Sequence, residues 1–538
     1  MAPPPVSTSA ATALVALASA VVTIASLFIR RFRRLPCPLP ARPASRLVEA
    51  VAAALPGSVL LPGDGAAFTR ATTAYWAVQE GEAGPGCVLR PRDALELGRA
   101  VEILQKEHAS QRQEGTARGV GLFAVRSGGH SAVPGAASIK DGVLIDLSLL
   151  CDVTPSDDGT SVTFGAGARW KDVYRLLDKV GLAVVGGRNS DVGVGGGISF
   201  FSPRHGLVCS NILSYEVVLA SGAVVVASAS ERPDLWRALK GGANNFGIVT
   251  RFTARSFPSA KIWSGFLYMP SSQADNVLAG FHEYVNRTYS DDPGTSYDLD
   301  AAGPLACFTY VQQLGIQMIS VNIVHTRPAE NEKKWPRNWG TSAFASIWRF
   351  WSTCKVRTMI SAGEEMSSLN PPGKRQVLAV TTIKNEPAAL AGTHEAYRAG
   401  IDAMRRIRGG SWTLVLQPLL PEWARKGDEN PLGLDEGPSD PLVMVSFTVN
   451  WSNARDDAHA RATTRRAIEM IERVAAERGS NHRYRYLNYC DEWQRPFEGY
   501  GEENWQFLKG VSRKYDPERL FQEACLGGFK LDIKDEAS

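Results

Sequence analysis

Between residues 84 and 255, short apolar strands alternate with amphipathic helices, and this alternation restricts the folds open to the chain. One helix is predicted to begin at Asp93, where Asp93 and Glu96 form a capping box. Another is predicted to end at Gly181, a residue suited to a left-handed helix cap. The turn 220–222, Ala-Ser-Gly, predicts a hairpin. Further strands are predicted at 123–126, 142–147 and 161–164. This mixture of elements predicts an α+β domain.

The character of the sequence changes from residue 258 to residue 480. Tryptophans gather between 335 and 351, and two longer helices are predicted around Phe281 and Ile471. A second α+β domain, with a sheet that covers a ligand, suits this segment. The final stretch, 481–530, is rich in Tyr, Asn and Trp, and its apolar residues need a partner to pack against. We expect this stretch to return to the first domain.

The excess positive charge of the chain lies at its N-terminus. Four arginines within residues 30–34 account for the whole formal net charge of +4, so residues 35–538 are electrically balanced. A balanced globular part argues against a nucleic-acid-binding protein. We therefore interpret Arg461, Arg465 and Arg466, on one predicted helix, as a solvated surface.

These arginines follow an apolar run, residues 10–29, that is long enough as a helix to cross a bilayer core of about 30 Å. A retained anchor would place the arginines in the cytosol and make the protein membrane-associated. A signal peptide cleaved near Ala18-Ser19-Ala20 would make it secreted, but the usual basic segment before the apolar core is missing. The anchor is the favoured interpretation.

The eight cysteines show neither a CxxC pair nor regular spacing. We therefore predict no zinc or other metal site. Their even number leaves disulfides open in a secreted chain. No feature of the sequence indicates an oligomeric state.

A first glycine-rich stretch, 126–131, has the sequence Arg-Ser-Gly-Gly-His-Ser. Consecutive glycines let a backbone approach a bound group closely, and they place His130 at the end of a predicted strand. A histidine there can be a nucleophile, a base or a covalent tether for a cofactor. An ordinary turn histidine is the simpler alternative.

Two more glycine-rich stretches follow at 186–197 and 241–249. Exposed amides in the first of them can cradle a pyrophosphate, although it lacks the GxGxxG dinucleotide pattern because Ile198 fills the last slot. A flexible turn is the alternative for this stretch. For 241–249 the alternative is a helix C-cap followed by a strand.

Taken together and in order, five segments resemble a known family. RSGGHS, SDVGVGG, SYEVVLASG, LKGGANNFGIVTRF and YLNYCDEWQ are similar to segments of the berberine-bridge-enzyme-like FAD-linked oxidoreductases of fungal type, in the vanillyl-alcohol-oxidase/p-cresol-methylhydroxylase (PCMH) superfamily. The resemblance implies an α+β, two-subdomain FAD-binding PCMH-type fold with an inserted α+β substrate domain, an antiparallel sheet covered by helices. The implied domains are 1–40 (anchor or signal plus linker), 41–257 (FAD-binding), 258–480 (substrate-binding) and 481–538 (C-terminal segment returning to the FAD domain).

The resemblance also assigns roles to single residues. His130 matches the histidine bonded to the flavin, and Tyr486 and Asn488 match an element beside the flavin ring. The residues matching the pyrophosphate loop are Arg126, Ser127, Gly128, Gly129 and Ser131. A second cofactor loop corresponds to Asp191, Val192, Gly193, Gly195 and Gly196. The adenosine side corresponds to Gly247, Ile248 and Val249.

Two departures from the family pattern have consequences. Asn189 occupies the place of a cysteine that forms a second flavin bond in some members, so at most one covalent link, through His130, is expected. The loop at Gly193–Gly197 is also about four or five residues shorter than in the family, a difference that side chains cannot absorb. It motivates an alternative function, a catalytically impaired, membrane-tethered binding or scaffold protein.

The resemblance implies an oxidoreductase in which FAD takes a hydride from a small organic substrate and passes electrons to oxygen or another acceptor. Alcohols, sugars and intermediates of secondary metabolism all fit. A protein base must remove the accompanying proton. Tyr486 is the favoured candidate and Tyr489 a second one, although Tyr486 is equally interpretable as a core residue. Gln417, on a predicted strand of the middle domain, would only position the substrate.

Overall fold

The computed structural model describes residues 45–115, 121–289, 298–328, 335–434 and 440–532. Residues 43–538 form one compact unit. The apolar run 10–29 and the linker after it lie outside the described residues. In the part of the chain that the structure describes, no helix combines the length and apolar character needed to cross a membrane.

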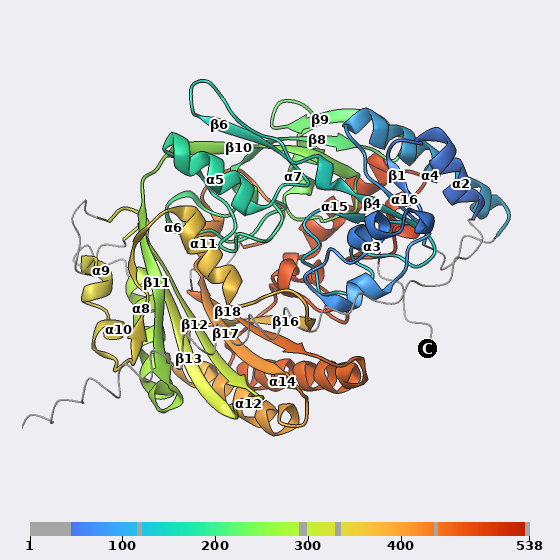
Figure 1. Cartoon of the computed structure of the whole chain (residues 1–538). Coiled ribbons are helices and arrows are strands. Elements are labelled where there is room, and N and C mark those ends of the chain that lie inside the picture. The colour runs from blue at the N-terminus through green and yellow to red at the C-terminus, as the bar shows by residue number, and fades with distance from the viewer. Residues whose placement is uncertain (1–44, 116–120, 290–297, 329–334, 435–439, 533–538) are drawn as a thin grey trace, which may run out of the picture. The chain divides into compact units, whose positions relative to one another are not determined.

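The first sheet is small and mostly parallel (Figure 1). Its strands, in spatial order, are β1 (Val59–Leu60), β2 (Cys87–Leu89), β4 (Val143–Asp146) and β3 (Phe123–Arg126). The accompanying helices are α2 (Arg46–Ala54), α3 (Ala66–Thr72) and α4 (Ala94–Gln113). The predicted start of α4 is confirmed, because the Asp93 side chain accepts a hydrogen bond of 2.7 Å from the Glu96 amide. Its apolar face, Leu97, Val101 and Leu104, is fully buried.

The second sheet is antiparallel throughout. Its strands are β5 (Val153–Pro155), β6 (Ser161–Gly165), β10 (Ile248–Pro258), β8 (Ile212–Val218) and β9 (Val224–Ser228), and β7 (Leu182–Val184) also pairs with β10. Strands β8 and β9 form the predicted hairpin. Its helices are α5 (Trp170–Val180), α6 (Ser202–His205) and α7 (Pro233–Leu239). Gly181 caps α5 in the left-handed conformation, at φ 70°, as predicted.

The third sheet is the largest, and all its strands pair antiparallel. In spatial order the strands are β14 (Trp351–Ser352), β11 (Ile262–Pro270), β13 (Ile316–His325), β12 (Ala301–Val311), β17 (Ser411–Leu419), β18 (Leu442–Trp451), β16 (Arg375–Lys384) and β19 (Asn481–His482), with β15 (Lys355–Arg357) also on β11. Its longer helices are α8 (Ala274–Tyr289), α12 (Pro387–Met404) and α14 (Asp457–Glu477). The shorter ones are α9 (Arg337–Gly340), α10 (Ala343–Ser346), α11 (Met359–Ser368) and α13 (Pro421–Ala424).

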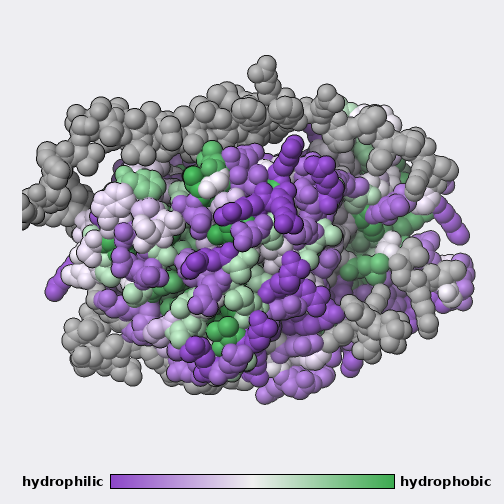
Figure 2. All heavy atoms as spheres, turned by 90° about the horizontal axis from the view of Figure 1, so that it is seen from below, coloured by the Kyte–Doolittle hydropathy of each residue, from purple (hydrophilic) through white to green (hydrophobic). Residues whose placement is uncertain are grey.

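The two faces of the third sheet differ in character. One face packs on α12 and α14, as shown by Trp412 of β17, whose indole N–H donates to the Tyr397 carbonyl of α12. The outer side of these helices is mostly hydrophilic with scattered apolar residues (Figure 2). Side chains alternate along a strand, so Gln417 lies on the opposite face together with Ser446 of β18 and Thr382 of β16. We call this second face, with its row of Gln417, Ser446 and Thr382, the polar face, and α12 and α14 lie on the other side of the sheet.

The C-terminal segment lies against elements of the first two sheets. It contains α15 (Glu502–Tyr515) and α16 (Leu520–Glu523), and α15 packs on α7. The Leu122 amide, just before β3, donates to the Ala524 carbonyl at 2.8 Å. The Ser512 hydroxyl donates to the Asn245 carbonyl just before β10. These contacts tie the end of the chain to strands that are about 270 to 400 residues earlier in sequence.

Candidate active site

Two glycine-rich loops touch each other, backbone against backbone. The first, 127–131, follows β3, and the second, 186–197, follows β7. A Cβ atom on Gly128 would lie only 2.6 Å from the Gly193 amide nitrogen, and one on Gly193 would lie 3.0 Å from the Gly128 nitrogen. The Ser127 hydroxyl anchors the first loop by donating to the Ala166 carbonyl. Only glycine at both positions permits this contact.

The second loop surrounds open space at its tip. A Cβ atom on Gly195 or Gly196 would have no neighbour within 4 Å. Gly196 has a φ of 139°, a backbone conformation that favours glycine. On either side of the tip, Val194 and Ile198 are buried in the core. The loop is therefore anchored at both ends, and its backbone at Gly195 and Gly196 faces open space.

The start of this loop is held by α5 and α11. The Lys171 ammonium lies 2.9 Å from the Asp191 carboxylate, and the Trp170 amide donates to the Val192 carbonyl. The Asn189 side-chain carbonyl accepts hydrogen bonds from the Asp191 amide and from the Ser367 hydroxyl of α11. The Asn189 side chain thus braces the loop.

His130 is a stacked, half-buried residue next to the loop contact. Its ring lies parallel to the Trp76 indole, with centroids 4.3 Å apart and planes 8° apart. The Trp76 amide donates to the Gly129 carbonyl, which ties the stack to the loop backbone. Burial, helped by the positive charge of Arg169, lowers the pKa of His130 to about 4. The imidazole is therefore neutral, and nucleophilic, at neutral pH.

Arg126 does not direct its charge toward the loops. Its guanidinium forms an ion pair of 2.9 Å with Asp146, and both side chains are buried. It also donates to the Ala71 carbonyl and lies over the Tyr75 ring, 4.6 Å from the centroid. The resemblance matched Arg126 to the loop that holds the pyrophosphate, whereas in the structure its guanidinium is engaged by these protein partners.

The residues expected on the adenosine side lie in the second sheet. Ile248 and Val249 begin β10 and pair with Val218 and Val217 of β8. A Cβ atom on Gly247 would lie 2.7 Å from the Val218 carbonyl oxygen, so this position also requires glycine.

Tyr486 lies where the tip of the second loop approaches the C-terminal segment. Its hydroxyl would be 3.3 Å from a Cβ atom on Gly197, and it accepts a hydrogen bond of 3.0 Å from the Asn488 amide. Its ring packs edge-on against Tyr489. Burial raises the pKa of Tyr486, with a further contribution from Tyr489. A tyrosine base needs a lowered pKa, so this environment favours the protonated phenol as a hydrogen-bond donor.

Gln417 connects the polar face of the third sheet to the second loop. Its side-chain oxygen accepts a hydrogen bond of 2.6 Å from the Arg188 guanidinium, although the two residues are 229 positions apart. Arg188 also lines a small cavity of about 10 Å³ between this loop and β12, room for about one water. A larger cavity of about 560 Å³ lies elsewhere, between α7 and residues 427–429, and none of the predicted site residues line it.

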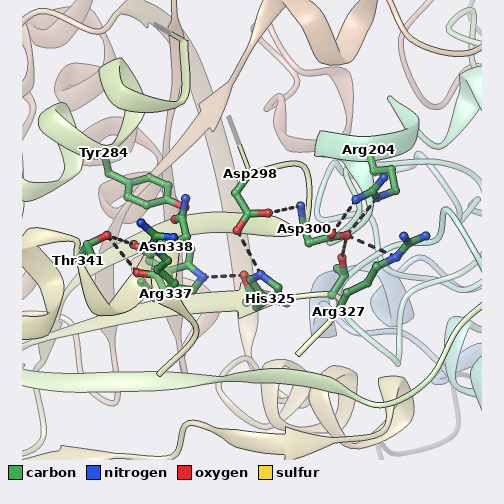
Figure 3. A network of polar contacts seen from close by, with 12 residues as sticks. Arg204, Tyr284, Asp298, Asp300, His325, Arg327, Arg337, Asn338 and Thr341 are labelled. Carbon is green, nitrogen blue, oxygen red and sulfur yellow. Dashed lines mark hydrogen bonds and ion pairs between the residues drawn. The ribbon is translucent and has the colours of Figure 1, made fainter. Parts of the chain in front are cut away.

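A polar network fixes the end of the second loop to the third sheet (Figure 3). Arg204 of α6 binds both carboxylate oxygens of Asp300, at 3.0 and 2.6 Å. The Thr326 hydroxyl donates to the same carboxylate, and His325 lies 3.1 Å from Asp298. Because α6 follows the loop directly, this network sets where the loop ends.

Comparisons with known proteins show the family to which the chain belongs. The profile of the FAD binding domain matches residues 85–228. An FAD-dependent monooxygenase of Fusarium proliferatum is 32% identical over 481 residues, covering 86% of this chain and 88% of the relative. The chain belongs to the berberine-bridge-enzyme-like FAD-linked oxidoreductases.

Other relatives of this oxidoreductase agree with that assignment. The bifunctional solanapyrone synthase of Alternaria solani is 30% identical over 481 residues, covering 88% of this chain and 87% of the relative. The crystal structure of 6-hydroxy-D-nicotine oxidase from Arthrobacter nicotinovorans superposes with a TM-score of 0.66 at 22% identity, covering 89% and 98% of the two chains. The predicted α+β PCMH-type fold and the FAD cofactor are thereby confirmed.

The residues of the oxidoreductase fit FAD. The cradle at Gly195 and Gly196 leaves space for a group that approaches the backbone. On the polar face of the third sheet, the Gln417 amide nitrogen and the hydroxyls of Ser446 and Thr382 are buried without a hydrogen-bond partner among the described residues. Buried polar atoms are normally paired, so this face is suited to a polar ligand. The described residues hold no cluster of metal-ligating side chains, and the seven described cysteines are free.

Three features of the site in this oxidoreductase were not among the residues predicted from the sequence. The first is Arg188, between Gly187 and Asn189. A charged side chain inside a glycine-rich loop was the sequence signal that could have indicated a role for it. Trp76, which stacks on His130, lies 54 residues before it. The polar row of Ser446 and Thr382 becomes visible only through strand register.

Proposed function

We propose that this oxidoreductase oxidises a small organic molecule by hydride transfer to FAD, with oxygen or another acceptor taking the electrons. FAD supplies the two-electron chemistry when bound. The observation that carries the proposal is the contact between the two glycine loops beside the neutral imidazole of His130. Relatives named as an FAD-dependent monooxygenase and a solanapyrone synthase support the oxidation of a small organic molecule.

In this proposal the first two sheets belong to the FAD-binding domain and the third sheet forms the substrate domain. Residues 41–257 and 481–538 form the FAD-binding domain, which the contacts between α15 and α7 support. Residues 258–480 form the substrate domain, whose polar face meets the second loop through Gln417 and Arg188.

The proposed cofactor contacts come from the loop backbones and one side chain. His130 forms the single covalent bond to FAD, and the amides around Gly129, Ser131, Gly193, Gly195 and Gly196 hold the pyrophosphate. Tyr486, Asn488, Tyr489 and Gln417 border the substrate. In this arrangement Tyr486 donates a hydrogen bond to a substrate oxygen, because burial keeps its phenol protonated.

The test of this function is the colour of the protein. Purified with FAD, the full chain should be yellow and keep its colour in the pellet after acid precipitation. His130→Ala should release its FAD into the acid supernatant, because His130 is the one proposed tether and Asn189 cannot form a thioether. His394→Ala is the matched control, since His394 also stacks on an aromatic ring, that of Tyr397, and has a lowered pKa, but it lies on α12. Protein that stays colourless with FAD supplied would contradict the proposed function.

We also propose that residues 10–29 anchor the chain in a membrane, with the arginines of residues 30–34 on the cytosolic side. The full chain expressed in a fungal host should sediment with membranes and resist extraction by carbonate. Mass spectrometry should recover its N-terminal peptide. A soluble, secreted chain beginning after Ala20 would instead show signal cleavage.

A further inference from the structure

Arg188 is a positive charge without an acidic partner. Its guanidinium is half-buried, and its hydrogen bond goes to the neutral side chain of Gln417. In the described part of the chain, no carboxylate lies within ion-pair distance of Arg188. Other buried arginines are paired, such as Arg126 with Asp146 and Arg357 with Glu365. A partly desolvated charge without a counter-ion is costly, which indicates that something outside the chain completes this site.

Arg188 faces the polar side of the third sheet. Burial raises the pKa of Cys307, on β12, to about 12, and the charge of Arg188 acts against that rise. Cys307 pairs with Val415, two residues from Gln417, so both side chains share one face. Arg188 acts on Tyr486 in the same way. The guanidinium is therefore close enough to act electrostatically on both the sheet and the C-terminal segment.

Hydrogen-bond donors surround this charge. The Gln417 amide nitrogen is buried without an acceptor among the described residues. The Tyr486 hydroxyl accepts from Asn488, and its own proton has no acceptor among these residues. The nearest carboxylate of the loop, Asp191, is already paired with Lys171. Unpaired donors beside a cation that has no acidic partner suit a negatively charged oxygen.

We propose that Arg188 selects substrates that carry an ionised oxygen acid, such as a carboxylate, an enolate or a phenolate, and that Gln417 orients the guanidinium for that contact. The planar guanidinium presents parallel N–H donors that match two oxygens of one anion. The Gln417 oxygen holds one edge of the guanidinium and leaves its other donors for the ligand. This substrate class rests on the proposed function, because it places the substrate beside the same face.

The experiment compares two probes of nearly equal shape, benzoate and benzamide, by calorimetry and by the absorbance of the FAD-loaded full chain. Wild-type protein should bind benzoate at least about ten-fold more tightly than benzamide. Arg188→Gln should weaken benzoate binding by about 10- to 100-fold and leave benzamide binding unchanged within about two-fold. The benzoate affinity of Arg188→Lys should lie between those of wild type and Arg188→Gln, because lysine keeps the charge but lacks the two parallel N–H donors of the guanidinium. Arg465→Gln, on an exposed part of α14, should match wild type.

Equal binding of the two probes to wild-type protein would overturn the inference, whatever the stability of the variants. The inference would also be overturned if Arg188→Gln changed the absorbance spectrum of the bound flavin, measured without benzoate, and kept its benzoate affinity. In that case the charge of Arg188 would act on the cofactor. A yellow protein in either case leaves the proposed function standing. A colourless protein would overturn the proposed function itself, and calorimetry with benzoate still tests the anion site.

Discussion

Replacing Asp146 by alanine will destabilise the protein by about 3–5 kcal/mol, because it leaves the Arg126 charge buried without its partner. The two side chains lie 2.9 Å apart and are 3% and 5% exposed. Removing one member of such a pair costs more than the pair contributes, since the remaining ion stays desolvated. The free energy of unfolding in urea measures the loss, and FAD retention should fall with it because Arg126 ends the strand that leads into the first loop.

The double variant Arg126→Met with Asp146→Leu should recover most of this loss, because apolar residues can replace a buried ion pair at little cost. Glu469→Ala, which breaks an exposed pair with Arg465 on α14, is the control and should cost less than about 1 kcal/mol. If Asp146→Ala lowers the free energy of unfolding no more than this control does, the ion pair between Arg126 and Asp146 does not stabilise the strand.

Gly128→Ala should abolish FAD retention and weaken folding as well. Its Cβ atom would lie 2.6 Å from the Gly193 nitrogen and 2.8 Å from the Gly193 Cα, so the two loops must separate. Backbone atoms cannot yield as a flexible side chain can. We expect less than about a tenth of the wild-type flavin content, measured from absorbance after gel filtration, with a cost in stability of about 1–3 kcal/mol, the range for an overpacked contact.

Two other glycines separate folding from cofactor binding. Gly195→Ala adds a Cβ atom in open space, so the chain should keep its stability yet lose flavin if the cradle holds FAD. Gly510→Ala, in α15 and also without neighbours, should retain both, with a slight gain in stability from helix propensity. Normal flavin content in Gly195→Ala would place the cofactor elsewhere.

The local elements of the fold were predictable because their signals lie within a few residues of one another. Asp93 caps α4 through Glu96, three positions on, and Gly181 ends α5 through its own backbone conformation. The order of the five motifs was likewise sufficient to place the chain among the FAD-linked oxidoreductases. Local capping signals and the order of motifs can both be recognised in the amino-acid sequence without knowledge of the tertiary structure.

Helix α12 shows where local signals fail. Two long helices were predicted for the middle segment, and the structure contains a third, α12, rich in alanine and glycine. Glycine lowers helix propensity, yet here it is required by packing. A Cβ atom on Gly392 would lie 2.8 Å from Val474 of α14, and one on Gly400 would lie 2.5 Å from the Trp412 ring. Neighbours distant in sequence stabilise this helix.

For the site too, some features were predictable from the sequence and others depended on the tertiary structure. From its sequence alone, the chain was recognisable as a flavin enzyme with His130 and two glycine loops, because spacing along the chain preserves those motifs. The partners of these residues depend on the tertiary structure: Arg126 pairs with Asp146 on the neighbouring strand, and Arg188 meets Gln417 across 229 residues. Charge pairing acts through space, over a few ångströms, so only the folded chain determines which charge is neutralised and which is left for a ligand.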